Sequence, residues 1–235
     1  MSSIPPTMTV LITGGSGLVG RGLAAYFSGR GCRVVLAARN LAELQQAAAE
    51  VDAAGCYAMD LAETASLTKL AAALDADGFV PDVLINNAAD VTSKPFTETS
   101  LEEIDHIIRV NVTGTLQLSR LLFPQLKAHG HGTIVNISSL AGYKPNPAQT
   151  VYSISKAAMN GISEGLRAEL GPRGIHVVNV ALMGVGEGPG RIPVDNVARR
   201  IERAILRKEP EIYFYHSTKW LMRLYAAFPA LSRLR

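Results

Sequence analysis

The sequence is poor in the residues and patterns that mark several classes of protein. It has only two cysteines in 235 residues, and Cys32 and Cys56 show neither metal-ligand spacing nor a disulfide framework. The five histidines also lack ligand spacing, so no metal site is predicted. A net charge of +3 argues against a nucleic-acid binder held by phosphate contacts. No uninterrupted apolar run approaches the length of a membrane span.

Residues 1–7 also lack the charged start and apolar core of a secretory signal, so a cytoplasmic protein is expected. Apolar residues are abundant instead. The chain is 48% hydrophobic and 18% charged, which is enough for a large core and unlike a disordered segment. The length suits a single domain over residues 1–235.

Apolar runs of strand length alternate with helical stretches. This predicts repeated βαβ units and a parallel sheet, and runs that are apolar throughout indicate strands covered by helices on both faces. The predicted strands are Met8–Ile12, Arg33–Ala37, Cys56–Met59, Val83–Ile85, Thr133–Ile137, Ile175–Val180 and Glu211–Phe214. The predicted helices are Leu18–Ser28, Leu41–Val51, Thr64–Leu74, Leu101–Ala128, Val151–Leu170 and Val194–Arg207. The fold class is therefore α/β, a Rossmann-like doubly wound parallel sheet of about seven strands flanked by helices.

A glycine-rich turn joins the first predicted strand to the first predicted helix. It reads Thr13-Gly14-Gly15-Ser16-Gly17-Leu18-Val19-Gly20. Gly15, Gly17 and Gly20 satisfy the pattern G-x-G-x-x-G, in which the glycines allow a tight turn, close approach of a pyrophosphate and helix–strand packing. The helix N-terminus then offers amide groups to the phosphates. Residues 14–20 are therefore predicted to bind a dinucleotide.

The end of the second strand bears on which dinucleotide binds. An acidic residue there would accept hydrogen bonds from the ribose 2′-hydroxyl of NAD, but the chain has Ala38 followed by Arg39. A guanidinium without a competing carboxylate favours a 2′-phosphate, so NADP(H) is predicted over NAD(H). The alternative is that Arg39 is an ordinary solvated arginine.

Tyr152 and Lys156 form a Tyr-x-x-x-Lys step in a predicted helix, so their side chains share one face. The ammonium is expected to lower the pKa of the phenol from its usual value of about 10. A hydroxyl from Ser139, at the end of a predicted strand, could hold the reacting oxygen during proton transfer. Exposed helices also carry such tyrosine–lysine pairs by chance.

Taken together, the motifs resemble the short-chain dehydrogenase/reductase family over about Met8–Ile212. Ser139 stands thirteen residues before Tyr152, the offset of that family, which selects Ser139 rather than Ser138. The other matching elements, in family order, are Asp60, the tetrad Asn86-Asn87-Ala88-Ala89 and Asn111. The resemblance is to the compact branch of the family, with an atypical glycine turn.

The resemblance implies four catalytic residues. Tyr152 would be the general acid for reduction or the base for oxidation, Lys156 would lower its pKa and bond the nicotinamide ribose, and Ser139 would orient the substrate. Asn111 would hold a water that links Lys156 to solvent. The alternative for Asn111 is a satisfied polar group in a buried helix.

The resemblance also extends the cofactor site beyond the glycine turn and Arg39. Asp60 and the Leu61 amide would contact adenine, and Asn87 would line the adenine-side ribose. The remaining implied contacts are Ala88, Ala89, Tyr152, Lys156, Met183 and Gly184. Asp60 could instead cap the helix near Thr64. Asn86 and Asn87 could instead hydrogen-bond to backbone groups at the ends of strands.

Two departures from the family pattern are visible. The spacing of Gly14, Gly17 and Gly20 is closer to an extended, epimerase-like branch. After the sixth strand the family shows Pro-Gly and then a threonine that contacts the nicotinamide. Here Met183-Gly184 leads into a glycine-rich segment without threonine, which predicts a short lid and an open cleft.

The substrate wall is expected from residues 91–96 and 140–149. Val91, Phe96, Leu140 and Tyr143 favour a small, uncharged, hydrophobic carbonyl or alcohol. Lys94 and Lys144 are interpreted as solvated rim residues.

The last predicted feature is a basic amphipathic tail over residues 216–235, which contains Trp220, Lys219 and Arg223. Two interpretations stay open: a helix packed on the protein or on a dimer partner, and a segment lying peripherally on an anionic membrane. The family resemblance implies a homodimer or homotetramer formed through the two long helices.

The predicted function is an NADP(H)-dependent oxidoreductase that moves a hydride between nicotinamide and a hydrophobic carbonyl/alcohol pair, with Tyr152 as acid or base. The alternatives are a non-catalytic NADP-binding sensor or scaffold and, on the glycine spacing, an epimerase or dehydratase.

Overall fold

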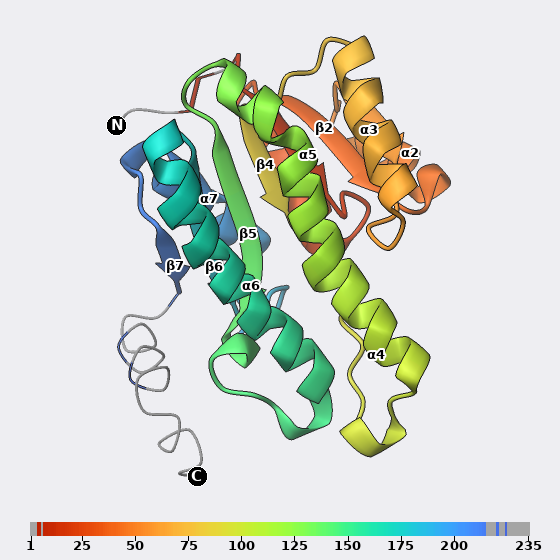
Figure 1. Ribbon diagram of the computed structural model, residues 1–235. Coiled ribbons are helices and arrows are strands. Elements are labelled where there is room, and N and C mark those ends of the chain that lie inside the picture. Colours follow the sequence, from red (N-terminus) through yellow and green to blue (C-terminus); the bar gives the residue numbers. More distant parts are fainter. Residues whose placement is uncertain (1–3, 6, 215–219, 221–223, 225–235) are drawn as a thin grey trace.

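The computed structural model describes residues 4, 5, 7–214, 220 and 224. Its centre is a sheet of seven parallel strands in the order β3-β2-β1-β4-β5-β6-β7 (Figure 1). The strands are β1 (Thr9–Thr13), β2 (Arg33–Ala38), β3 (Gly55–Ala58), β4 (Val83–Asn86), β5 (Thr133–Ser139), β6 (His176–Leu182) and β7 (Glu211–Tyr213).

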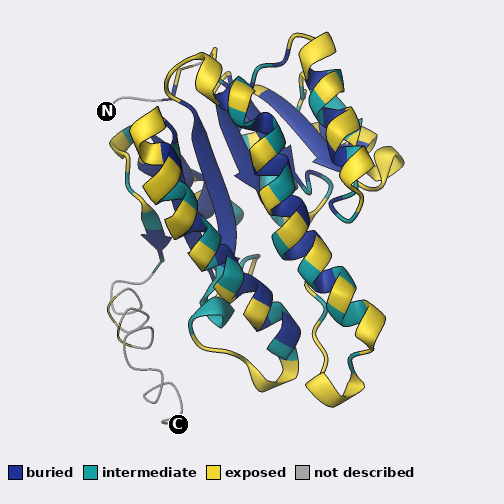
Figure 2. Ribbon diagram, in the orientation of Figure 1, coloured by how far each residue is buried: buried dark blue, intermediate teal, exposed yellow. Residues whose placement is uncertain are grey.

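Helices cover both faces of the sheet. Helices α1, α2 and α7 pack on one face, and α3, α5 and α6 pack on the other. The bounds are α1 (Leu18–Ser28), α2 (Leu41–Glu50), α3 (Thr64–Ala76), α4 (Leu101–Ile108), α5 (Thr115–Ala128), α6 (Thr150–Leu170) and α7 (Val194–Arg207). Figure 2 shows buried strands beneath helices whose outer faces are exposed. The predicted fold class is confirmed, and burial on both faces explains why the strands are apolar rather than alternating.

Side-chain caps help to set where the helices begin. The Asn40 side chain accepts hydrogen bonds from the amides of Ala42 and Glu43 at the start of α2. Ser100 and Glu103 form a reciprocal capping box at the start of α4. Such caps satisfy amides that have no partner within the helix.

The predicted helical stretch over residues 101–128 is confirmed, and it contains one feature that was not predicted. A π-helical segment, η2 (Arg109–Gly114), separates α4 from α5. Gly114 lies so close to the preceding loop that a Cβ there would be 2.0 Å from the Leu61 carbonyl oxygen. The interruption therefore occurs where the long helix meets the loop after β3, and such π-turns are common at functional sites.

The strand order places a crevice at one edge of the sheet. β1 pairs with β2 on one side and with β4 on the other, so the chain order reverses between β1 and β4. In open parallel sheets ligands bind outside the carboxyl ends of the strands at such a reversal. The glycine turn follows β1, and Asn87 follows β4. The fold thus brings two predicted cofactor motifs to the expected place.

Most of the predicted tail lies outside the described residues. Of residues 216–235, the structure describes Trp220 and Leu224, which are 73% and 44% exposed. Within the described part of the chain, no helix combines the length and the apolar character needed to cross a bilayer.

Candidate active site and cofactor cavity

Gly14, Gly17 and Gly20 have different roles in the glycine turn. Gly14 has φ +68°, and a Cβ there would be 2.9 Å from the Ala88 Cα. A Cβ on Gly20 would be 2.1 Å from the Gly14 carbonyl oxygen, whereas the nearest atom to a Cβ on Gly17 is 3.5 Å away. Gly14 therefore makes the turn, Gly20 packs the helix against it and Gly17 leaves the backbone open. Gly15 packs on Leu36, where a Cβ would be 2.9 Å from the Leu36 Cβ.

The start of α1 is suited to an anion. Gly17 is its N-cap, and no side chain caps the helix there. The first amides of a helix have no intrahelical acceptor, and they carry the positive end of the helix dipole. A phosphate group would satisfy these donors, so the residues present fit a dinucleotide.

A cavity of about 530 Å³ opens beside this turn. This volume is in the range of small-molecule and cofactor sites. Its predicted lining residues are Gly14, Ser16, Gly17, Leu18, Val19, Gly20, Arg39, Asp60, Leu61, Asn87, Ala88 and Ala89. Lining residues that were not predicted as cofactor contacts are Ala38, Asn40, Glu43, Met59, Asp90, Val91, His106 and Val110. The predicted contacts Gly15, Tyr152, Lys156, Met183 and Gly184 do not line it.

Asn87 and Thr13 lock the glycine turn to the end of β4. The Asn87 amide nitrogen donates to the carbonyl oxygens of Thr13 (2.9 Å) and Gly14 (3.3 Å). The Thr13 hydroxyl oxygen accepts hydrogen bonds from the backbone N–H groups of Asn87 and Ala88, both at 3.0 Å. The side chain of Asn87 thus ties the strand end to the turn, as the alternative interpretation holds. Thr13 was missed because its only sequence signal is its position before the glycines.

Asp60 lies at the cavity wall but does not cap α3. Its Oδ1 accepts a hydrogen bond from the Ala62 N–H at 2.9 Å, and its own N–H donates to Ser66 Oγ at 3.0 Å. The N-cap of α3 is Glu63. The helix-cap interpretation of Asp60 is therefore wrong, and the carboxylate is held by a turn at the edge of the cavity.

Arg39 is exposed at the cavity, next to the start of α2. No hydrogen bond or ion pair joins it to any residue that the structure describes. The Asn40 side chain occupies the first amides of α2, so they are not free for a ligand. Glu43 lines the same wall, which places one carboxylate near the arginine.

Tyr152 and Ser139 meet at the carboxyl edge of the sheet. Tyr152 lies in the first turn of α6, Ser139 ends β5, and their side chains are hydrogen-bonded. Burial raises the pKa of Tyr152, and the Ser139 hydrogen bond acts in the opposite direction. Ser138 faces the other way and donates to Asn160 Oδ1 at 2.7 Å. Of the two serines, Ser139 is therefore the one placed beside the phenol.

Lys156 does not make the phenol acidic in this structure, contrary to the prediction. Lys156 is 4% exposed, and its ammonium donates to the Ile137 carbonyl oxygen at 2.8 Å. Lys156 Nζ lies 5.6 Å from the centre of the Tyr152 ring. Burial lowers the pKa of Lys156 to about 8. Desolvation thus dominates both groups: it disfavours the phenolate and the ammonium alike.

Asn111 links the cavity to the catalytic helix. Its Nδ2 donates to the Asp90 carbonyl oxygen (2.8 Å) and to Ser155 Oγ (3.0 Å), and its Oδ1 accepts from the Asp90 N–H (2.7 Å). Ser155 Oγ in turn donates to the Tyr152 carbonyl oxygen at 2.7 Å. Both amide protons are therefore used within the protein, as the alternative interpretation holds. The water-holding role of Asn111 stays a prediction.

The architecture and motif set can be compared with known proteins. The family model described as short chain dehydrogenase matches residues 8–188. The chain belongs to the short-chain dehydrogenase family. The Drosophila melanogaster protein named dehydrogenase/reductase SDR family protein 7-like is 34% identical over 235 aligned residues, which cover 88% of this chain and 72% of that protein.

Solved structures similar to this short-chain dehydrogenase hold different nicotinamide cofactors. A metagenomic short-chain oxidoreductase in complex with NADP has a TM-score of 0.79 and 29% identity, covering 90% of this chain and 97% of that one. The 3-ketoacyl-(acyl-carrier-protein) reductase of Brucella melitensis, complexed with NADH, has a TM-score of 0.77 and 27% identity, with coverages of 84% and 90%. Membership of this family supports a dehydrogenase/reductase role for the chain.

The segment after β6 in this short-chain dehydrogenase forms a compact turn. The Gly186 N–H donates to the Ile192 carbonyl oxygen (3.0 Å), and the Ile192 N–H donates to the Gly184 carbonyl oxygen (2.9 Å). Met183, just before the turn, is 48% exposed. Two of the predicted cofactor contacts, Met183 and Gly184, therefore lie at the start of a short closed loop.

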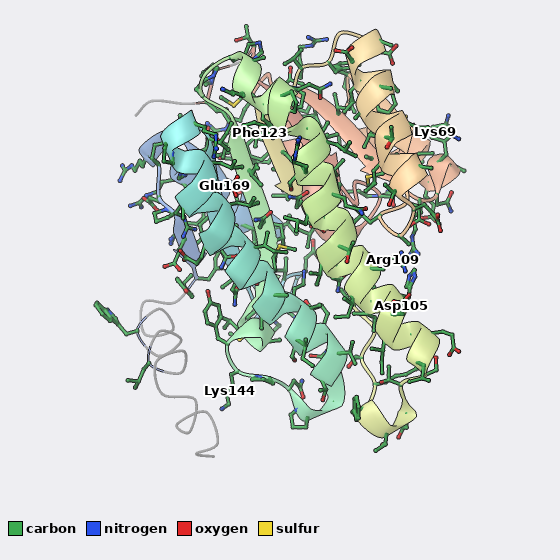
Figure 3. The ribbon with its side chains drawn as sticks, in the orientation of Figure 1. Lys69, Asp105, Arg109, Phe123, Lys144 and Glu169 are labelled. Carbon is green, nitrogen blue, oxygen red and sulfur yellow. The ribbon has the colours of Figure 1, made fainter. Side chains whose placement is uncertain are left out.

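The predicted substrate wall is only partly assembled. Val91 and Phe96 are 66% and 59% exposed. The Tyr143 hydroxyl accepts hydrogen bonds from Asn179 (3.2 Å) and Tyr213 (3.0 Å), so its polar end is engaged at the β6–β7 edge. Two predicted rim residues behave differently: Lys94 pairs with Glu103, and Lys144 lies in the loop between β5 and α6 (Figure 3).

Proposed function

We propose that this short-chain dehydrogenase is an NADP(H)-dependent oxidoreductase that acts on an uncharged, hydrophobic carbonyl/alcohol pair. The main support for this proposal is a chain of hydrogen bonds that runs from Asp90 through Asn111 and Ser155 to Tyr152. It connects the wall of the cofactor cavity to the helix that holds the proton donor. A rigid link between binding site and catalytic group is what a positioned reaction requires.

The residues of the cavity would hold the cofactor. The uncapped start of α1 and the open backbone at Gly17 suit its pyrophosphate, and Asp60 and Leu61 suit its adenine end. When bound, the nicotinamide supplies or accepts the hydride. The chain itself contributes binding, orientation and the proton.

The proton chemistry rests on Tyr152 and Ser139. Because burial raises the pKa of Tyr152, the phenol keeps its proton at neutral pH. A protonated phenol hydrogen-bonded to Ser139 is suited to donate to a carbonyl oxygen. The site thus supports the general-acid role of Tyr152 in carbonyl reduction.

Reduction is expected to slow at alkaline pH because of Lys156. Its pKa of about 8 means that the ammonium is present below that pH and is lost above it. The pKa of Tyr152 is raised by burial, so the phenol loses its proton only at higher pH. We expect kcat to be level below about pH 8 and to fall by up to about tenfold per pH unit above it. A pH profile at saturating NADPH measures this. Lys156→Arg, which stays charged, should remove the fall, and a flat wild-type profile up to pH 10 would contradict the assignment.

Cofactor preference is expected to depend on Arg39. Arg39→Ala should raise the Kd for NADPH about tenfold and leave that for NADH unchanged, since a charge-assisted phosphate contact contributes about 1.5–3 kcal/mol. Fluorescence titration of both cofactors measures the effect. Lys69→Ala removes an exposed cation from α3 (Figure 3) and is the matched control. Equal affinities of the wild type for NADPH and NADH would refute the preference. The carboxylate of Glu43, on the same wall, would then explain why the 2′-phosphate is not favoured.

A second candidate function is NADP binding without efficient catalysis. One observation favours it: Met183 and Gly184 lie outside the cavity. NADPH oxidation measured across aldehydes, ketones and quinones separates the candidates. Stoichiometric consumption with any carbonyl supports the oxidoreductase, and tight binding without turnover supports the sensor. Substrate conversion without net NADPH loss would indicate an epimerase.

A further inference from the structure

An unassigned histidine stands at the outer end of the cofactor cavity. His106 lies in the last turn of α4, one helical turn before Val110 of η2. Both residues line the cavity together with Asp60 and Leu61. Residues spaced in this way along a helical stretch lie on the same face, so His106 continues the wall that Val110 begins.

The Asp90 carboxylate faces the imidazole at this place. The main chain of Asp90 is clamped on both sides by Asn111, with an N–H to Oδ1 distance of 2.7 Å and an Nδ2 to carbonyl oxygen distance of 2.8 Å. Its Oδ1 accepts a hydrogen bond from the Thr92 N–H at 2.8 Å. The other carboxylate oxygen, Oδ2, lies 3.7 Å from His106 Nε2. A carboxylate that accepts one hydrogen bond, on a main chain held by two more, thus faces a side chain that is itself 39% exposed.

Two charged residues near the imidazole pair with each other. Asp105 of α4 and Arg109 of η2, both labelled in Figure 3, are 3.4 Å apart. An exposed aspartate–histidine pair by itself contributes little to stability. Stabilisation of the fold therefore does not account for this pair, whereas a role in ligand binding does.

The sheet order indicates which part of a dinucleotide reaches His106. Asp60 and Leu61 follow β3, which lies at the far edge of the sheet from β5 and β6. Tyr152 and Lys156, beside β5, do not line the cavity. His106 therefore belongs to the adenine half of the site, where the apolar side chains of Leu61 and Val110 form the rest of the wall.

We infer that His106, oriented by Asp90, contacts the adenine base of the bound cofactor. An imidazole ring offers a flat surface for the purine and a ring nitrogen for its polar edge. Stacking of a base on an aromatic side chain contributes about 1–3 kcal/mol by alanine substitution. This inference rests on the proposed function, because it requires a nicotinamide dinucleotide in the cavity.

The test compares binding of three probes by calorimetry. NADPH carries both halves, ADP-ribose carries adenine without nicotinamide or 2′-phosphate, and reduced nicotinamide mononucleotide lacks adenine. His106→Ala should raise the Kd of NADPH and of ADP-ribose about tenfold and leave binding of the mononucleotide unchanged. His106→Phe keeps a flat ring and should bind ADP-ribose within about threefold of wild type.

The chain offers a matched control. His129 and Asp82 form another aspartate–histidine pair, with 2.8 Å between Nδ1 and Oδ1, next to the amino end of β1. His129→Ala should leave all three affinities unchanged. Wild-type affinity of His106→Ala for ADP-ribose, or an equal loss for the mononucleotide, would overturn the inference while leaving the proposed function intact. A wild-type protein that binds neither NADPH nor ADP-ribose would overturn both.

Discussion

Replacing Tyr152 with phenylalanine is expected to lower kcat for carbonyl reduction about a thousandfold, since a positioned general acid contributes about 10²–10⁴-fold. The variant keeps the ring and loses the hydroxyl that is hydrogen-bonded to Ser139. The ring stays packed in the first turn of α6, so the fold should be retained. Stopped-flow measurement of NADPH oxidation at saturating substrate measures the loss.

The specificity of this effect can be checked with a second tyrosine. Tyr57→Phe removes a hydroxyl that donates to Asp77 at 2.5 Å on the β3–α3 side of the molecule. It should leave kcat unchanged. Tyr152→Phe should bind NADPH with wild-type affinity, because Tyr152 does not line the cavity. A Tyr152→Phe enzyme with more than about a tenth of wild-type kcat would mean that another group supplies the proton.

The fold could be predicted from the sequence because its main determinant is local. Each strand is a short apolar run, and each helix repeats apolar residues at helical spacing, so α1 and α7 have the predicted bounds. The π-helix η2 could not be predicted in this way. Its position coincides with the close approach of Gly114 to Leu61, residues far apart in sequence, and the helical pattern runs through it without a break.

The catalytic residues could be found from spacing, but their energetics could not. The Tyr152–Lys156 step predicts that the two side chains are neighbours, and they are, at 5.6 Å from Nζ to the ring centre. Spacing does not report that Lys156 is 4% exposed and donates to a main-chain carbonyl. The burial of Tyr152 raises the pKa of its phenol. The nearby charge of Lys156, considered alone, predicts that this pKa is lowered.

The same limit explains the residues that were missed. His106 and Asp90 belong to no motif, and they meet only because α4 returns past the loop after β4. The pattern of glycines contains both Gly14 and Gly15, and it does not indicate which of them makes the turn. The positive φ of Gly14 and the contact of Gly15 with Leu36 depend on how the turn crosses the neighbouring strands, which the pattern does not encode.

Substituting Gly20 with alanine is expected to raise the Kd for NADPH about a hundredfold, equivalent to about 2.8 kcal/mol. The new Cβ would lie 2.1 Å from the Gly14 carbonyl oxygen and 2.9 Å from the Gly15 Cα. These neighbours are backbone atoms, so the glycine turn itself must move away from α1. That movement displaces the open backbone at Gly17 and the uncapped helix start that suit a pyrophosphate. Overpacking of this kind also costs about 1–3 kcal/mol of stability.

Gly165→Ala separates this effect from a general consequence of placing alanine in a helix. Gly165 is exposed in α6, and a Cβ there would meet no atom within 4 Å. Alanine is favoured over glycine in a helix by about 0.8–1 kcal/mol, so Gly165→Ala should raise the melting temperature and leave NADPH binding unchanged. Gly20→Ala has the same propensity gain and should nevertheless lower both. Thermal unfolding without cofactor, together with NADPH titration, measures the two quantities independently. Wild-type NADPH affinity in Gly20→Ala would show that the turn does not hold the cofactor's phosphates.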